Sequence, residues 1–251
     1  MALHPESYLN SLSAVLVDAC ENSSCPLIEK FEPVAKGANG ATHFKLSLKG
    51  GGTFSLKVST RIGNGTKQEY LAAFAARAIG LSATGRCALI QVPPDVPVLA
   101  NREAALLEWT DGAIAVGELP TVSAARLTAR VAIQLGGWVW LCCWLGIGDR
   151  HLGNWIWSEA TESVGGIDNE EWAMGGQKAD HLRGPCAQIL GGNIDATRAA
   201  AIQAGAAAAH DAFDREKVRI EAEFLRVGIA IPPAPPDAKQ MTEDLTGLTL
   251  P

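Results

Sequence analysis

The sequence predicts an α+β fold with two lobes, a small β-rich lobe followed by a mainly helical one. The first part of the chain alternates apolar and polar side chains over short segments that glycines separate, as strands do. The second part spaces its apolar side chains as helices do, and 47% hydrophobic residues in a chain of 251 support a packed core. We therefore expect lobes at 1–110 and 111–231, followed by a proline-rich tail at 232–251 that is extended or disordered.

The first lobe is expected to consist of strands and a helix around a glycine loop. Residues 5–21 have amphipathic helical spacing, and the loop is Gly37-Ala38-Asn39-Gly40. Strands are expected at 33–36, 44–48, 54–58, 87–92 and 104–109. Thr66 begins a helix with Glu69 three residues on, in the pattern of a capping box, and this helix ends at Gly80.

The second lobe is predicted to contain two long helical segments. One runs on from Val122 and includes an apolar run at 131–148, in which Gln134 is the one clearly polar side chain. That run approaches the length of a membrane span, but its glycines and the polar residues directly after it favour a buried helix. The second helix is expected at about 196–227.

Charge and cysteine content argue against several classes of function. The 21 Lys and Arg residues against 27 Asp and Glu give a net charge of −6, the opposite of what binding to nucleic acids or anionic membranes requires. The six cysteines form no C-x-x-C pair and no zinc-ligand spacing, and no signal-peptide pattern opens the sequence. We expect a cytoplasmic protein without nucleic-acid partners or a membrane span, although an effector secreted by another route would look the same.

The clearest chemical signal lies in residues 145–154, with the sequence LGIGDRHLGN, and in Asp168. Asp149 and Asn154 have the five-residue separation of the catalytic loop of protein kinases, where Asp orients the acceptor hydroxyl and Asn binds a metal ion. Asp168 follows an apolar, strand-like segment at 164–167, where a metal-binding carboxylate would lie. Phosphoryl transfer from ATP needs few protein groups, and these residues supply several of them.

Residues 145–151 resemble the L-G-I-G-D-R-H catalytic loop of phosphatidylinositol 3-kinases and 4-kinases. The segments 154–155 and 167–169 are most similar to the type II phosphatidylinositol 4-kinases and their bacterial relatives. The resemblance is dense over about 25 residues of the chain. It implies a two-lobed, protein-kinase-like fold that binds ATP and Mg²⁺.

The resemblance also implies roles for single residues. Asp149 corresponds to the catalytic aspartate, and Arg150 and His151 would be loop residues near the transferred phosphate, with His151 taking part in catalysis. Asn154 and Asp168 correspond to the metal-binding residues.

The first lobe supplies matching candidates for nucleotide binding. Lys57, in a predicted strand, fits the kinase lysine that reaches the phosphates, and Glu69 on the next helix fits its acidic partner. Gly37 and Gly40 would let backbone N–H groups approach phosphates, although the loop is not a full G-x-G-x-x-G.

The segment 106–112 resembles a kinase hinge, in which backbone groups of Glu108 and Thr110 would meet adenine. Each candidate alone also has a simpler interpretation. Lys57 can be a solvated strand residue, Glu69 a capping-box acid, the glycine loop a hairpin turn, and the Asp and Asn residues turn or cap residues. Their order along the chain favours a kinase: glycine loop, lysine, helix glutamate, hinge, Asp-x4-Asn, Asp.

We therefore expect a phosphotransferase that uses ATP and Mg²⁺ to phosphorylate a hydroxyl group. The charge pattern favours a protein Ser/Thr as acceptor over a phosphatidylinositol-like lipid. A small-molecule kinase similar to aminoglycoside phosphotransferases is a second hypothesis, because residues 148–154 also match their G-D-x-H-x-G-N loop. A pseudokinase or nucleotide-binding regulator is the third, since the presence of ligand residues does not establish turnover.

Overall fold

The computed structural model describes residues 28–36, 42–48, 53–58, 64–91, 103–108, 112–119, 129–169, 172 and 178–249. The fold belongs to the α+β class, as predicted, and divides into two compact units. Unit 1 lies within 1–74 and 85–111, and unit 2 within 75–84 and 112–251. The helix expected at 5–21 lies outside the described residues.

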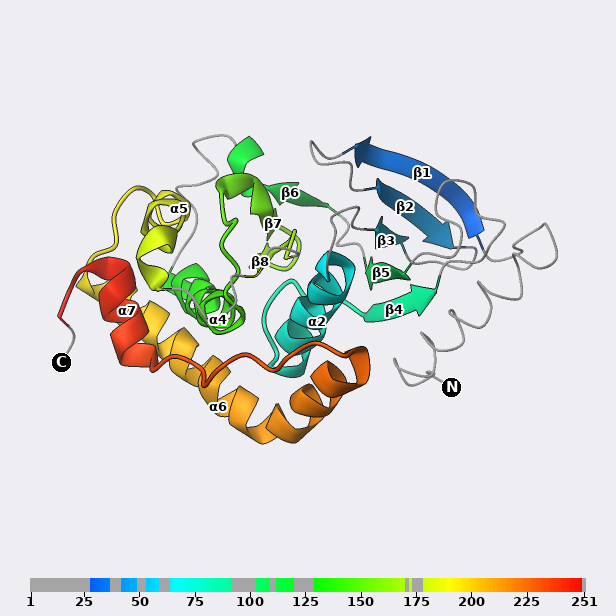
Figure 1. The fold of residues 1–251 in the computed structure, drawn as a ribbon. Coiled ribbons are helices and arrows are strands. Elements are labelled where there is room, and N and C mark those ends of the chain that lie inside the picture. Colours follow the sequence, from blue (N-terminus) through cyan, green and yellow to red (C-terminus); the bar gives the residue numbers. More distant parts are fainter. Residues whose placement is uncertain are drawn as a thin grey trace, which may run out of the picture. The chain divides into compact units, whose positions relative to one another are not determined.

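Unit 1 is built on a five-stranded antiparallel sheet with the strand order β1-β2-β3-β5-β4 (Figure 1). Its strands are β1 (Ile28–Lys36), β2 (Thr42–Leu48), β3 (Thr53–Val58), β4 (Cys87–Gln91) and β5 (Glu103–Glu108). All five strands expected from the sequence are present, and β1 begins five residues earlier than predicted, at Ile28 instead of residue 33.

The two faces of β3 differ in polarity. Phe54 and Leu56 are buried, whereas Ser55 and Lys57 point to the other face and are partly exposed. His43 of β2 lies opposite Lys57 in the register and forms a hydrogen bond with Ser55, with 2.6 Å between Nε2 and Oγ. The lysine therefore extends from the polar face of this sheet, next to a second pair of polar side chains.

Helix α2 (Gly65–Ala78) follows β3 along the chain and extends from unit 1 into unit 2. It begins one residue earlier than the capping-box pattern at Thr66 predicts. The helix ends just before Gly80, whose φ of +73° is the left-handed conformation expected of a glycine at this position.

Unit 2 is mainly helical and also contains a three-stranded sheet with the order β6-β7-β8. Its helices are α4 (Ala129–Leu145), α5 (Arg183–Ile189), α6 (Ala196–Val227) and α7 (Ala238–Thr246). Its strands are β6 (Ala113–Ala115), β7 (Trp155–Ser158) and β8 (Ser163–Gly166), and short 3₁₀ turns lie at Val116–Glu118, Leu152–Asn154 and Ala179–Leu182. The bounds of α6 match the prediction, and α4 covers most of the apolar run as a buried helix.

Helices α4 and α6 pack with their backbones in close approach. A Cβ added at Gly136 of α4 would lie 2.8 Å from the carbonyl carbon of Ile202. One added at Gly205 of α6 would lie 2.7 Å from the carbonyl carbon of Ile133. Gly136, one of the glycines that weaken the helical pattern of the apolar run, and Gly205 are therefore residues that let α4 and α6 pack closely. Among the helices that the structure describes, none has the length and apolar character needed to cross a membrane.

The prediction of an extended or disordered tail at 232–251 is wrong for residues 238–246, which form α7. Met241 and Leu245 of this helix are buried, which is what stabilises so short a helix. The prolines before it serve as hydrogen-bond acceptors for two indole N–H groups of α4, Trp140 to Pro236 and Trp144 to Pro233, each over 3.1 Å.

Candidate functional site

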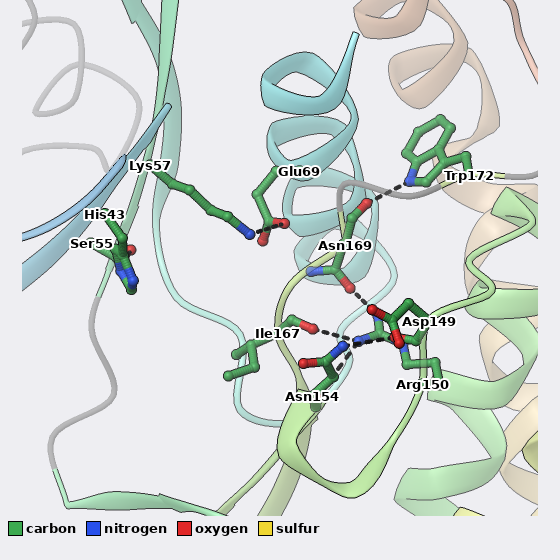
Figure 2. Close-up of polar contacts among 10 residues, drawn as sticks. All are labelled: His43, Ser55, Lys57, Glu69, Asp149, Arg150, Asn154, Ile167, Asn169 and Trp172. Carbon is green, nitrogen blue, oxygen red and sulfur yellow. Dashed lines mark hydrogen bonds and ion pairs between the residues drawn. The ribbon is translucent and has the colours of Figure 1, made fainter. Parts of the chain in front are cut away.

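Lys57 and Glu69, the predicted phosphate-binding lysine and its acidic partner, form an ion pair in unit 1 (Figure 2). Lys57 Nζ lies 3.4 Å from Glu69 Oε2, and the exposed fractions of the two side chains are 12% and 2%. A carboxylate this deeply buried requires a charged partner, so the pair holds the lysine in one direction. The interpretation of Glu69 as a capping-box acid does not account for this contact.

Glu108, the predicted hinge residue, is bound within unit 1 by Arg86. Its backbone N–H donates to the Arg86 carbonyl over 2.7 Å. Its carboxylate accepts from Arg86 Nη2 over 2.6 Å and from the Arg86 backbone N–H over 2.8 Å. An adenine contact at this residue would therefore have to use a group other than this N–H. Thr110, Gly37 and Gly40 lie outside the described residues.

In unit 2, the hairpin of β7 and β8 brings the two predicted metal ligands together. Asn154 directly precedes β7, and Asp168 follows β8 by two residues. The strands pair Trp155 with Gly166, and the same ladder continues as a hydrogen bond from Ile167 N–H to the Asn154 carbonyl, over 3.0 Å. Antiparallel pairing thus sets Asn154 beside the residue that leads into Asp168.

The side chain of Asn154 is oriented by the predicted catalytic-loop segment itself. Its Nδ2 donates to the Asp149 carbonyl over 2.8 Å, and the residue is 5% exposed. Because the amide nitrogen is used in this bond, Oδ1 is the atom of this side chain that remains to bind a cation. The bond also spans the five residues between the two positions, so it fixes the shape of the loop.

Asp168 has a backbone conformation that is uncommon for a residue with a side chain. Its φ is +60°, in the left-handed region, which aspartate tolerates better than most residues but still at a cost of about 1–3 kcal/mol. Strain of this kind is concentrated at functional positions. It supports the interpretation that the direction of this carboxylate matters.

The donor set at this hairpin fits magnesium. An amide oxygen and a carboxylate are hard oxygen ligands, and Mg²⁺ commonly takes one or two protein ligands and completes its shell with water and phosphate oxygens. A group of three or more His, Cys, Asp or Glu side chains able to hold a metal is absent from the part of the chain that the structure describes. The amide and carboxylate oxygens suit a hard cation that arrives with a phosphate ligand better than zinc, which favours nitrogen and sulfur ligands.

Asp149 and His151, the predicted catalytic residues, are both open to solvent. Their side chains are 45% and 64% exposed, and His151 Nε2 lies 3.9 Å from Asp149 Oδ1. The imidazole is oriented from its other side, because Nδ1 accepts the Gly153 N–H over 3.0 Å. Both side chains are therefore able to reach a substrate in solution.

Arg150, between these two exposed residues, is itself buried. The residue is 3% exposed, and its guanidinium turns inward toward residues 167–169 (Figure 2). Its expected place near the transferred phosphate stays a prediction. Sequence reasoning also missed a role for Asn169, whose side-chain oxygen accepts from Arg150 Nη2. The available signal was an amide side chain directly after the metal-binding candidate Asp168.

Comparison with known proteins finds no matching family model and no matching curated protein. Similar solved structures include the open conformation of CtTel1, with 14% sequence identity and a TM-score of 0.45. They also include the complete CtTel1 dimer with C2 symmetry, with 15% identity and a TM-score of 0.46. Each match covers 81% of this chain and 10% of the other, so the chain spans about a tenth of the length of these proteins.

Proposed function

We propose that the chain is a phosphotransferase that uses ATP and Mg²⁺ to phosphorylate a hydroxyl group. The observation that carries the proposal is the β7–β8 hairpin, where Asn154 bonds the residue directly before the strained Asp168. The exposed carboxylate of Asp149 belongs to the same loop, which its hydrogen bond with Asn154 shapes.

Each candidate residue has a separate role in the proposed phosphoryl transfer. Lys57, held by Glu69, binds phosphate oxygens, for which an oriented ammonium is suited. Asn154 Oδ1 and the Asp168 carboxylate hold the metal. When bound, magnesium neutralises the charge that develops on the transferred group. Asp149 accepts the hydrogen bond of the incoming hydroxyl and orients it, which requires the exposure that this side chain has.

The acceptor proposed first is a serine or threonine hydroxyl of a protein. The net charge of −6 disfavours approach to an anionic lipid surface, which is the requirement for a phosphatidylinositol-like substrate. The exposed pair of Asp149 and His151 suits a hydroxyl on a large molecule, because neither side chain is enclosed.

The test is transfer of label from ATP to acceptors offered in parallel. Protein is incubated with Mg²⁺ and either γ-labelled or α-labelled ATP, together with a mixed Ser/Thr-containing protein substrate, phosphatidylinositol vesicles or an aminoglycoside. We expect γ-label, and not α-label, on the protein substrate. Label on the vesicles or on the aminoglycoside would show that the acceptor is a lipid or a small molecule and not a protein. Transfer of α-label would indicate AMP transfer. Bound ATP without any transfer would indicate a nucleotide-binding regulator.

A further inference from the structure

Arg150 is a buried charge whose polar partners within the described residues are all neutral. Its Nε donates to Cys142 Sγ over 3.2 Å, and Nη1 donates to the carbonyls of Asn154 and Ile167 over 3.2 and 2.5 Å. Nη2 donates to Asn169 Oδ1, and the guanidinium lies over the Trp155 ring at 5.5 Å from its centroid. A guanidinium is tolerated at 3% exposure only when its donors are satisfied in this way.

Two of these acceptors flank the strained residue. The Ile167 carbonyl belongs to the peptide that enters Asp168, and the Asn169 side chain belongs to the residue that leaves it. Holding both neighbours fixes the orientation of the backbone on either side of the +60° φ angle. A left-handed backbone at a residue other than glycine persists only where several contacts hold it in place. The Arg150 guanidinium supplies two such contacts, one on each side of Asp168.

The same guanidinium also reaches the second metal-ligand candidate. Nη1 bonds the Asn154 carbonyl as well as that of Ile167, so one nitrogen fixes the backbones of both strands where the hairpin presents its ligands. The space that it occupies depends on Gly166, where an added Cβ would lie 3.2 Å from Nη2. The planar, forked donor set of arginine fits these acceptors, whereas a lysine ammonium cannot span them.

We infer that Arg150 is a positioning residue that sets the distance and orientation between Asn154 and Asp168 for binding Mg²⁺. The inference rests on the proposed function, because it assigns these two residues to the metal. In this role Arg150 acts through Asp168 and Asn154, because its buried guanidinium bonds the backbone carbonyls of Asn154 and Ile167 and the side chain of Asn169. Residues that orient metal ligands in this way typically change metal affinity by about 10–100-fold when they are replaced.

The test measures the Mg²⁺ concentration that half-saturates ATP binding, by calorimetry, in four proteins. Arg150→Lys keeps the charge and removes the fork, and Asn169→Ala removes one acceptor while Arg150 stays in place. Arg226→Lys is the matched control, because Arg226 is an exposed arginine paired with Glu223 within α6. We expect the first two variants to raise the half-saturating Mg²⁺ about 10-fold or more, and the control to match the wild type. Affinity for ATP without Mg²⁺ should stay at the wild-type level in all four.

Two further measurements separate positioning from general stability. Melting temperature without ligand shows whether each variant folds, and if Arg150→Lys does not fold, Asn169→Ala carries the test alone. Asn169→Asp keeps an acceptor for Arg150 and should not show the loss of Mg²⁺ affinity seen with alanine. The inference is overturned if the folded variants lose melting temperature but keep the wild-type Mg²⁺ dependence, or if the aspartate variant fails as alanine does. A wild type without Mg²⁺-dependent ATP binding would instead overturn the proposed function, and the inference with it.

Discussion

Replacing Gly205 with alanine is expected to destabilise unit 2, because the crossing of α4 and α6 leaves no room for a methyl group. The added Cβ would lie 2.7 Å from the carbonyl carbon of Ile133, which is about 1 Å shorter than the packing distance of carbon atoms. The obstructing atoms are α4 backbone, so no side-chain rotation relieves the overlap and the helices must separate. Overpacking costs about 1–3 kcal/mol, and a backbone obstacle belongs at the upper end. The helix propensity of alanine offsets about 1 kcal/mol, which leaves a loss of about 2 kcal/mol in the free energy of unfolding.

Gly184→Ala is the matched control, because the same methyl group at this position of α5 would have no atom within 4 Å. It should leave the melting temperature unchanged or raise it slightly. Gly205→Ala should lower the melting temperature by about 4–8 °C, at about 2–4 °C per kcal/mol for a chain of this size. Thermal unfolding followed by the fluorescence of the buried α4 tryptophans measures both variants. Equal melting temperatures would refute the close backbone approach.

Three other outcomes are expected. Millimolar ATP with Mg²⁺ should raise the melting temperature of the wild type by mass action, and Lys57→Ala should reduce that rise; a wild type indifferent to nucleotide would contradict the assignment of the lysine. Removal of residues 232–251 should lower the melting temperature, because the buried Met241 and Leu245 are lost and the Trp140 and Trp144 N–H groups lose their acceptors, at about 1–3 kcal/mol for each buried donor left without a partner. An unchanged transition would show that α7 adds no stability. Burial raises the pKa of the Cys143 and Cys186 thiols, so they stay protonated at neutral and mildly alkaline pH. Mass spectrometry after iodoacetamide treatment at pH 8 should find these two unlabelled until denaturant is added, and rapid labelling of the folded protein would contradict their burial.

Local patterns predict much of the fold, because strands and helices leave periodic traces in the sequence. The alternation around Lys57 identifies β3, and the spacing of apolar residues identifies α6 to within a residue or two. The tail was mispredicted because its prolines dominate the composition, whereas α7 is stabilised by burial against the rest of unit 2, which no local pattern reports.

The candidate site, like the fold, could be predicted from the sequence only in part. The spacing of Asp149, Asn154 and Asp168 makes them candidates without any coordinates. The direction of Arg150 could not be predicted, because a charged loop residue is expected at the surface. Its acceptors come from α4 and from residues up to 19 positions further on, and the pairing of β7 with β8 is what brings the residues after β8 back toward Asn154.

The measurement that tests the account most directly compares single-turnover transfer of the γ-phosphoryl label by the wild type, Asp149→Asn and Asp168→Asn, with ATP binding titrated with and without Mg²⁺. Asp149→Asn should keep Mg²⁺-dependent ATP binding and slow the transfer by about 10²-fold or more, because it removes the group that orients the hydroxyl. Asp168→Asn should weaken both Mg²⁺-dependent binding and transfer, because it removes a metal ligand. Transfer at the wild-type rate in both variants would show that these carboxylates are turn residues, and the proposed site would be wrong.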